Sequence, residues 1–465
     1  MKKNLILILS GLLLNIYNCA IAQNYGNWKI ISSLSIPRAN HSSTVLPNGN
    51  ILVTGSIGSP NDLSSCEIYD TLLKTWRYTN PMNIGRSFHK AILFNNGKVL
   101  VVGGFMVRSC ELFDPITETW VFTDSLIIKR SFDLNAILLN DGNVLVVGGR
   151  AYSDDYSYSM ILNNCEIYNV GIGLWKSTDT LRIARFKHTA TTLLDGRVLV
   201  TGGIGKNGKI LNSCEIYNPA SGTWAFVDSL NIQRRNHSAT LLPSGKVLVA
   251  GGRNDSYSWL TSCEVYDPKS NTWTLVDSMI FPRQDHSGIL VSDSVILFSG
   301  GSMNSIVWEL YDAKNFTPMY WELLPFEKIS HDILQSPNGR AISIGGRTHS
   351  GIAVYSTDIC LIYEHNLTLV KIENNETPNS FKLFQNYPNP FNSQTVITYQ
   401  VPEKEFISLK IFNPLGEELL TLDEGIKERG TYKITFNGSN LSTGIYYCRL
   451  NTRNYFKTIK MLIIK

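Results

Sequence analysis

The sequence predicts an all-β protein, in which a seven-bladed β-propeller is followed by a small β-sandwich domain. Three observations support this fold class. A unit of about 50 residues occurs seven times, each unit divides into four short apolar runs, and the repeat stops at residue 366, before a final stretch with a pattern of its own. With 465 residues, 43% of them hydrophobic, the chain is long enough for one large and one smaller domain.

Residues 1–22 have the pattern of a secretory signal peptide. Two lysines precede an apolar run over 5–14, and Ala20-Ile21-Ala22 has the small-x-small pattern of a cleavage site. No later apolar run approaches the ~20 residues that a transmembrane helix requires. The net charge of +4 is spread along the chain and gives no argument for nucleic acid. We therefore expect an exported protein without a transmembrane segment.

The repeat is defined by the spacing of a few residue types. Each unit begins with a Trp, ten residues later comes an Arg, three residues after it a His or Asp, and about fourteen residues further a glycine pair or its remnant. The Trp residues are Trp28, Trp76, Trp120, Trp175, Trp224, Trp273 and Trp321, and the Arg residues are Arg38, Arg86, Arg130, Arg185, Arg234 and Arg283. The third position holds His41, His89, Asp133, His188, His237 and His286, and the looser seventh unit has Lys328 and His331.

Each unit also predicts four strands. Two apolar runs joined by a turn precede the glycine pair, as in 238–242 and 246–250, and several of these turns carry Asn-Gly or Asp-Gly, which favour tight hairpins. A Cys-Glu-Ile-Tyr stretch such as 214–217 gives the third strand, and the Trp gives the fourth. The first Trp strand has no blade before it, and the last unit has no Trp strand after Tyr363. We therefore expect the Trp28 strand to close the ring.

This unit resembles the repeat of kelch propellers, whose markers are the glycine pair, the Tyr and the later Trp. The resemblance covers 23–366 and includes galactose-oxidase-like copper enzymes, whose chemistry requires a Tyr-His pair in sequence and a Cys joined to a Tyr. The chain has no Tyr-His dipeptide, no sialidase box and no Gly-x-Ser-x-Gly motif. The sequence therefore names no catalytic residue, metal ligand or cofactor, although it leaves open an enzyme built from dispersed residues.

The repeated His, Arg and Cys residues are interpreted as structural. Symmetry spreads the His residues around a ring instead of bringing them to one metal ion, so each is expected to bond the backbone of its own blade. The Arg residues are expected to clamp blade to blade. Six cysteines occupy one third-strand position, where equivalent sites lie too far apart for disulfides, so we expect buried thiols. They are Cys66, Cys110, Cys165, Cys214, Cys263 and Cys360, and Trp308 takes the remaining position.

Only the loop between the second and third strands varies in length. Its glycine-to-cysteine spacing runs through 11, 7, 17, 12, 12 and 15 residues, and such loops on a rigid scaffold are where binding evolves. Aromatic and charged residues in these loops suit a glycan or a protein partner, although the aromatics could instead pack their own loops. The candidate ligand-binding residues are Arg150, Tyr152, Tyr156 and Tyr158 of blade three, Arg253, Tyr257 and Trp259 of blade five, and Arg347 and His349 of blade seven.

The chain changes character after the propeller. A polar segment over 367–380 reads as a linker, and 381–465 contains Phe-Gln-Asn-Tyr-Pro-Asn-Pro-Phe-Asn at 384–392, alternating strands and a basic apolar end. This domain resembles the type A C-terminal sorting domain of type IX secretion cargo from Bacteroidota-type bacteria. The resemblance implies handling by the type IX machinery and its sortase, and release or attachment to surface lipopolysaccharide.

Together these features predict a secreted or cell-surface protein whose propeller loop face binds a glycan or a protein. An extracellular carbohydrate-active hydrolase or oxidase, and a structural or adhesion protein, are the alternatives. Convergent carboxylates and Arg at the mouth of the loop face would favour the enzyme, and a flat aromatic rim would favour binding.

Overall fold

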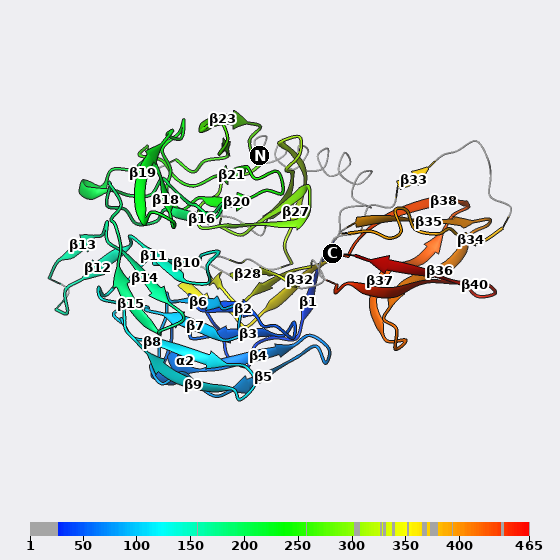
Figure 1. The fold of residues 1–465 in the computed structure, drawn as a ribbon, viewed down its shortest axis with the longest axis horizontal. Helices are drawn as coiled ribbons and strands as arrows, with labels where there is room; N and C mark the ends of the chain where they lie inside the picture. Colours follow the sequence, from blue (N-terminus) through cyan, green and yellow to red (C-terminus); the bar gives the residue numbers. More distant parts are fainter. Residues whose placement is uncertain are drawn as a thin grey trace, which may run out of the picture. The chain divides into compact units, whose positions relative to one another are not determined.

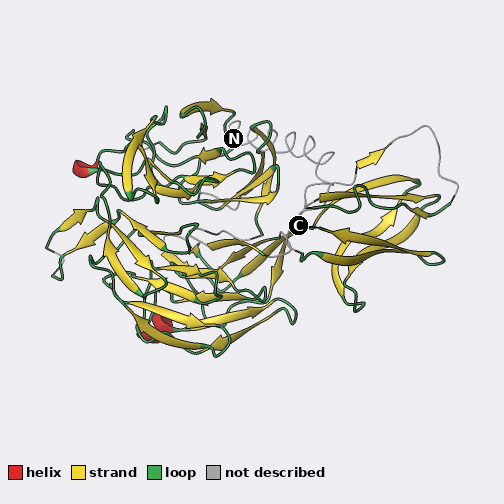
Figure 2. Ribbon diagram, in the orientation of Figure 1, coloured by secondary structure: helices red, strands yellow, loops and turns green. Residues whose placement is uncertain are grey.

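The computed structural model describes residues 27–464, except 156, 257, 302–306, 326–327, 329–331, 337–339, 351–352, 365–369, 373–379, 393 and 439–440. Residues 1–22, with the expected signal peptide, lie outside the described part. The chain divides into two compact units, one formed by 28–363 and one that contains 364–465. In both, the regular secondary structure is almost wholly β-strand, with loops and turns between the strands (Figure 2).

The first unit is a ring of seven four-stranded antiparallel sheets (Figure 1). Blade one contains β2 (Ser42–Val45), β3 (Ile51–Thr54), β4 (Cys66–Asp70) and β5 (Thr75–Thr79), and blade two β6 (Lys90–Leu93), β7 (Val99–Val102), β8 (Cys110–Asp114) and β9 (Thr119–Thr123). Blade three contains β10 (Asn135–Leu138), β11 (Val144–Val147), β14 (Cys165–Asn169) and β15 (Leu174–Ser177), and blade four β16 (Thr189–Thr192), β17 (Val198–Thr201), β18 (Cys214–Asn218) and β19 (Thr223–Val227). Blade five contains β20 (Ser238–Leu241), β21 (Val247–Ala250), β22 (Cys263–Asp267) and β23 (Thr272–Val276), and blade six β24 (Ser287–Ser292), β25 (Val295–Ser299), β26 (Val307–Asp312) and β27 (Thr317–Leu323).

Blade seven joins the two ends of the propeller. It contains β28 (Asp332–Gln335), β29 (Ala341–Ile344) and β32 (Cys360–Glu364), and its outermost strand is β1 (Asn27–Ile31), which lies next to β32. The ring of Trp28 lies 5.5 Å from that of Tyr363. This is the closure that the sequence predicts, and it leaves no blade with an incomplete sheet.

The hydrophobic core lies between the blades. The second strand of each blade is buried along its whole length, as in β21, and in blades four and five the third-strand Tyr packs against the Trp opposite it. The Trp273 indole then donates a hydrogen bond to the Asp228 carbonyl of blade four, at 3.0 Å. One such cluster combines Leu199 of blade four with Val249 of blade five. Each blade therefore completes the core of the one before it.

Six buried Arg–Glu pairs fasten the links between blades. Arg234, for example, is fully buried, donates to the Gly251 and Ser262 carbonyls of blade five and pairs with Glu264 at 2.7 Å. Glu264 also accepts from the backbone N–H groups of Asn231 and Ile232, which lie in the link from blade four. The other pairs are Arg38–Glu67, Arg86–Glu111, Arg130–Glu166, Arg185–Glu215 and Arg283–Glu309. The Arg residues are structural clamps, as predicted, but each guanidinium fixes its link to the blade that the link enters and does not bond the neighbouring blade.

The seventh copy of this clamp has a cation but no carboxylate partner. Lys328 is fully buried, and its ammonium donates to the carbonyls of Ile359 and Ser343 and to the Ser343 hydroxyl. Leu361 stands where the other blades carry the Glu, and burial lowers the pKa of Lys328 to about 8.

The structure corrects three details of the repeat. First, His89, His237 and His286 do not bond the backbone of their own blade, because their Nε2 atoms form hydrogen bonds with hydroxyls of the preceding blade: Thr54 at 2.8 Å, Thr201 at 2.8 Å and Ser238 at 2.9 Å. The first glycine of the preceding pair makes room for this contact. A Cβ on Gly202 would lie 2.4 Å from the Arg234 carbonyl oxygen and 2.9 Å from His237.

The other two corrections concern register. Blade three has one extra residue before β10, so Asp133 has the positive φ found at Asn236 and Asp285, and the buried Leu134 takes the His position. In blade six a bulge between Leu310 and Tyr311 shifts β27, so that Trp321 lies opposite Glu309 instead of opposite Tyr311. Trp321 is therefore not an equivalent of the framework Trp residues.

The six propeller cysteines are buried free thiols, as predicted. Burial raises their pKa values, to about 12 for Cys214 and Cys263, so the thiolate is suppressed. Trp308 pairs with Ser299 in the register that Cys214 has opposite Thr201, which confirms its place in the series.

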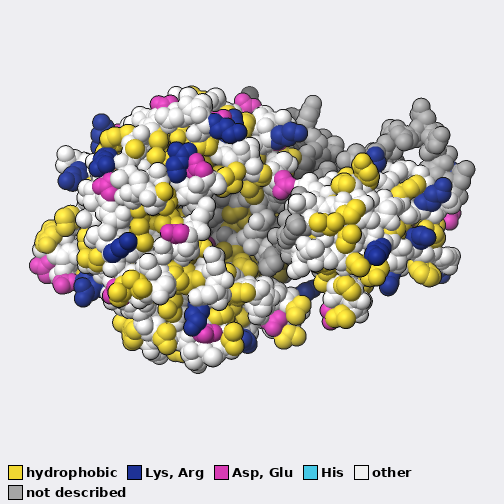
Figure 3. Space-filling model, in the orientation of Figure 1, with side chains coloured by type: hydrophobic (Ala, Val, Ile, Leu, Met, Phe, Trp, Pro, Cys, Tyr) yellow, Lys and Arg dark blue, Asp and Glu magenta, His cyan; other side chains and the backbone are white. Residues whose placement is uncertain are grey.

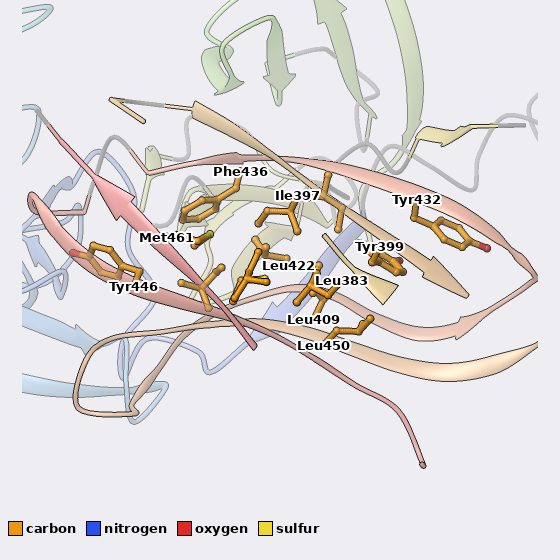
Figure 4. Close-up of a cluster of buried hydrophobic side chains, with 14 of the residues drawn as sticks. Leu383, Ile397, Tyr399, Leu409, Leu422, Tyr432, Phe436, Tyr446, Leu450 and Met461 are labelled. Atoms are coloured by element: carbon orange, nitrogen blue, oxygen red, sulfur yellow. The ribbon is translucent and has the colours of Figure 1, made fainter. Parts of the chain in front are cut away.

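The C-terminal unit is a β-sandwich of two four-stranded sheets. One sheet has the order β33 (Val370–Ile372), β38 (Gly430–Asn437), β35 (Gln394–Val401), β34 (Lys382–Leu383), and the other β37 (Glu418–Lys427), β36 (Glu405–Phe412), β39 (Gly444–Asn451), β40 (Phe456–Ile463). Alternate residues of these strands point inward and fill the core between the sheets (Figure 4). Because β33 pairs with β38, part of the expected linker belongs to this sheet.

No helix among the described residues is both long and apolar enough to cross a membrane.

Candidate functional site: a hollow on the loop face

The variable loops carry the elements that lie outside the blade sheets. Blade one has the short helix α2 (Pro60–Ser64), blade three the hairpin β12 (Arg150–Tyr152)–β13 (Ser159–Ile161), blade four the 3-10 turn η1 (Lys206–Gly208), and blade seven the hairpin β30 (Arg347–Ser350)–β31 (Ala353–Ser356). In an antiparallel four-stranded blade, the loop between strands two and three emerges at the same end as the link that enters strand one. We call this end of the propeller the loop face.

The loops of blades three, four and five enclose a hollow of about 370 Å³. Its lining residues are Arg150, Ser159 and Ile161 of blade three, Phe186, Ile204, Gly208 and Ile210 of blade four, and Arg235, Asn254 and Asp255 of blade five. This volume lies within the range of sites that take small molecules.

One backbone contact places the walls of the hollow. In blades three to five, the residue after the glycine pair pairs with a residue of the link that enters the same blade, as Phe132 with Arg150, Phe186 with Ile204, and Arg235 with Arg253. The side chains at these positions differ from blade to blade although the backbone is repeated. Blade four therefore supplies apolar residues between two blades that supply Arg.

Arg150 is held in place by two rings and a hydroxyl. Its guanidinium carbon lies 4.8 Å from the centre of the Tyr152 ring and 5.4 Å from that of Phe186, and Nη2 donates to the Ser159 hydroxyl at 2.8 Å. Cation–π contacts of this kind orient the guanidinium without using its hydrogen-bond donors.

Asp255 ties the loops of two blades together. Its carboxylate accepts from the backbone N–H of Ile210 at 3.1 Å and from the side-chain amide of Gln233 at 2.7 Å. The Ile210 contact fixes the loop of blade four against blade five, and the Gln233 contact fixes the link between these blades. Both occupy part of the acceptor capacity of the only carboxylate among the described lining residues.

The structure brings together some of the predicted ligand residues and not others. Arg150 lines the hollow and Tyr152 supports it, while Arg253 is paired with Trp259 on the adjoining segment. Tyr158 is 64% exposed on the hairpin. Arg347 lies on β30 of blade seven, away from the lining residues. Tyr156 and Tyr257 lie outside the described residues, as does the side chain of His349.

Sequence reasoning missed the residues that blade four and the links contribute. Phe186 and Arg235 directly follow the framework Arg185 and Arg234, in a segment of constant length, and the loop of blade four carries no aromatic residue. A comparison of the residue after each framework Arg could have found them, since it reads Ala, Ser, Ser, Phe, Arg and Gln in blades one to six.

Charged residues also gather where the inner strands begin. Asp133, Lys187 and Asp285 all have positive φ there, and backbone hydrogen bonds pass from Lys187 through Asn236 to Asp285. Burial raises the pKa of Asp133, and the charge of Asp285 adds to the rise while Lys187 opposes it. Solvent reaches Asp285, yet the surrounding protein displaces enough water to raise its pKa too.

Comparison with known families agrees with the repeat and with the terminal domain. A family model described as the KLHDC2/KLHL20/DRC7 kelch-repeats domain matches residues 126–301, and one described as a secretion system C-terminal sorting domain matches residues 385–465. The chain is a kelch-repeat β-propeller with a C-terminal secretion-sorting domain. The sorting domain implies handling by the type IX secretion machinery, and the protein is exported to the medium or the cell surface.

A solved structure shares the fold of this kelch protein. A fungal alcohol oxidase of the AA5 family, in complex with copper, matches with a TM-score of 0.61 and 13% identity, over 95% of this chain and 100% of that chain. A structure titled as that of YjhT matches with a TM-score of 0.45 and 12% identity, over 70% of this chain and 98% of that one. No curated protein sequence gives a significant match.

The described residues do not fit the copper of such an oxidase. The positive-φ residues at the starts of the inner strands are Asn40, Phe88, Asp133, Lys187, Asn236 and Asp285, which include no His, Tyr or Cys. The repeat His side chains are buried and the propeller thiols are covered. Nor do three or more His, Cys, Asp or Glu side chains of the described part lie close enough to hold a metal ion.

Proposed function

We propose that the exported kelch propeller is a binding protein whose ligand, a glycan, sits in the hollow on the loop face. The single observation that supports this most strongly is the hollow itself, formed where three consecutive variable loops meet. A protein partner would need ~800 Å² of contact surface, whereas a concave site of this size suits one or two sugar residues. The visible face in Figure 3 mixes basic, acidic and hydrophobic side chains and has no broad basic patch.

The test is a glycan array probed with the full exported chain and with a variant in which the hollow is filled. Ser159→Trp places a bulky ring in the hollow, so it should abolish binding. Met160→Trp is the matched control, because Met160 is the next residue of the same strand, is 52% exposed and does not line the hollow. Binding that survives Ser159→Trp, or no binding to any glycan, would contradict the proposal.

The second candidate function is an extracellular carbohydrate-active enzyme. It is favoured by Asp133 and Asp285, two carboxyl groups with raised pKa on either side of Lys187. If this candidate is right, a glycan bound in the array assay is converted with time, and Asp133→Asn or Asp285→Asn stops the conversion. Mass spectrometry of the bound glycan after incubation separates the two functions.

We further propose that the sorting domain is removed during export and that the propeller is released or joined to surface lipopolysaccharide, as the family resemblance implies. The mass of the protein recovered outside the cell should then lack residues 381–465. A deletion of 381–465 should leave the propeller inside the outer membrane. Recovery of the full-length chain outside the cell would contradict the cleavage.

A further inference from the structure

The described lining residues of the hollow include two guanidinium groups, of Arg150 and Arg235, and one carboxylate, of Asp255. Asp255 already accepts hydrogen bonds from Ile210 and Gln233, so it neutralises the positive charge of the two Arg residues only in part. A further cation, Arg253, lies directly behind the lining as the backbone partner of Arg235. The interior of the hollow is therefore net cationic.

The Arg235–Arg253 pairing is unusual because it sets two like charges opposite each other. The two residues exchange backbone hydrogen bonds of 3.1 and 2.9 Å, so they stand directly opposite each other as a hydrogen-bonded antiparallel pair. Like charges in this position destabilise a sheet. Burial raises the pKa of Asp285, and the charges of Lys187 and Arg235 oppose the rise, so Asp285 partly compensates the Arg235 charge on the side of the inner strands. A bound anion would compensate on the side of the hollow.

The two Arg residues that line the hollow also have donors without a partner. The Nε–H groups of Arg150 and Arg235 are buried, and neither has a hydrogen-bond partner among the described residues. Such buried donors are unfavourable unless a ligand or ion accepts from them. Since a guanidinium presents its donors in a planar fork, the group that it suits best is a carboxylate or a sulfate.

The floor between the two Arg residues is apolar. Phe186, Ile204 and Ile210, all buried side chains of blade four, lie between Arg150 and Arg235. Sugar rings present apolar C–H faces that pack on such surfaces. We propose that the hollow binds an acidic sugar residue, whose carboxylate or sulfate ester lies between Arg150 and Arg235 and whose ring packs on Phe186, Ile204 and Ile210. This inference rests on the proposed glycan-binding function and narrows its ligand class.

The test is isothermal titration of the full exported chain with trigalacturonic acid, its methyl ester, a sulfated galactose trisaccharide and pentaglutamate. We expect the acid or the sulfate to bind and the neutral methyl ester to bind at least about tenfold more weakly, because the ester loses the charge-assisted hydrogen bonds. Whichever of the two anionic sugars binds identifies the source of the negative charge.

Arg150→Gln and Arg235→Gln should each weaken binding of the anionic sugar by about tenfold or more, and Arg150→Lys should restore part of it by keeping the charge without the fork. Arg108→Gln, which removes the same charge from an exposed residue of the blade-two loop, should leave affinity unchanged. Circular dichroism melting identifies any variant that does not fold.

Three results would overturn the inference. The methyl ester could bind as tightly as the acid, pentaglutamate could bind more tightly than either anionic sugar, or Arg150→Gln and Arg235→Gln could both fold and keep full affinity. A neutral glycan that is bound and is lost in Ser159→Trp would leave the proposed function standing, whereas no glycan binding at all would remove both.

Discussion

At the scale of single residues, the buried Arg–Glu pairs are positions where losing one partner should be costly, because the other charge stays buried. Each pair removes two charges from water, and this is tolerated because the carbonyls of the glycine pair and the backbone N–H groups of the link complete the hydrogen bonds. Blade seven departs from this scheme with Lys328 and Leu361, and there a neutral set of carbonyl and hydroxyl groups solvates the cation.

Glu264→Gln should cost about 3–5 kcal/mol of unfolding free energy, because it leaves the Arg234 guanidinium buried without a counter-charge. Urea unfolding of the full chain measures this loss. Glu118→Gln is the control, since its partner Arg77 is half exposed and surface pairs contribute less than about 1 kcal/mol. Equal effects of the two substitutions would show that the buried pair has no special role.

At the scale of elements, the sequence predicts the framework well and the site poorly. The framework is predictable because the Arg binds the first glycine of the pair, and the spacing between them, 17 or 18 residues in the first six units, is visible in the sequence. The extra residue before β10 is also visible in the sequence, because fifteen residues separate Asp133 from Gly148 where the other units have fourteen from the His to the glycine. Only the structure shows that Leu134, and not Asp133, fills the His position.

The hollow could not be predicted because it is formed by three blades at once. Arg150 was recognisable in a long loop, but Phe186, Ile204 and Arg235 lie in segments of ordinary length, and only the curvature of the ring brings them together. Whether these residues line a hollow depends on how neighbouring blades are arranged, and the sequence of one repeat does not contain that information.

The loop aromatics Tyr158, which is exposed, and Trp259, which is half-buried, should contribute to binding and not to folding. Replacing Tyr158 and Trp259 by Ala should weaken the glycan complex by about 2 kcal/mol or more if they are contact residues, and should change the melting temperature little. Trp224→Ala should do the reverse, at a cost of about 3–5 kcal/mol of stability, because that ring is buried against Tyr217 and the preceding blade. If the loop variant unfolds as readily as the framework variant, these aromatics pack their own loops.

At the scale of the whole molecule, the propeller is a closed ring of interfaces, and five of its blade junctions contain a buried His. Burial lowers the pKa of His41, His188 and His286 to about 3, and that of His89 and His237 well below the ordinary value. Around His237 the positive charge of Arg234 lowers the pKa further. These imidazoles therefore stay neutral in the folded ring at pH values at which they are protonated in the unfolded chain.

This difference predicts acid instability of the propeller. In the unfolded chain these His residues titrate near 6.5, so between about pH 6.5 and pH 3 unfolding takes up protons and stability falls as the pH falls, by up to ~1.4 kcal/mol per His and pH unit. Asp133 and Asp332, whose raised pKa values act in the opposite direction, reduce the effect at the acid end. Urea midpoints should decrease between pH 7.5 and pH 5.5, and His237→Gln should have a shallower dependence. Equal midpoints at the two pH values would contradict this account.

The central claim is that the ligand occupies the hollow between blades three, four and five. The most direct measurement is a crystal structure of the full exported chain soaked with the glycan that it binds most tightly. The account predicts ligand density between Arg150 and Arg235, over Phe186 and Ile204, with the framework of the blades unchanged. Density confined to the region of Asp133 and Asp285, or to the opposite face of the propeller, would contradict it.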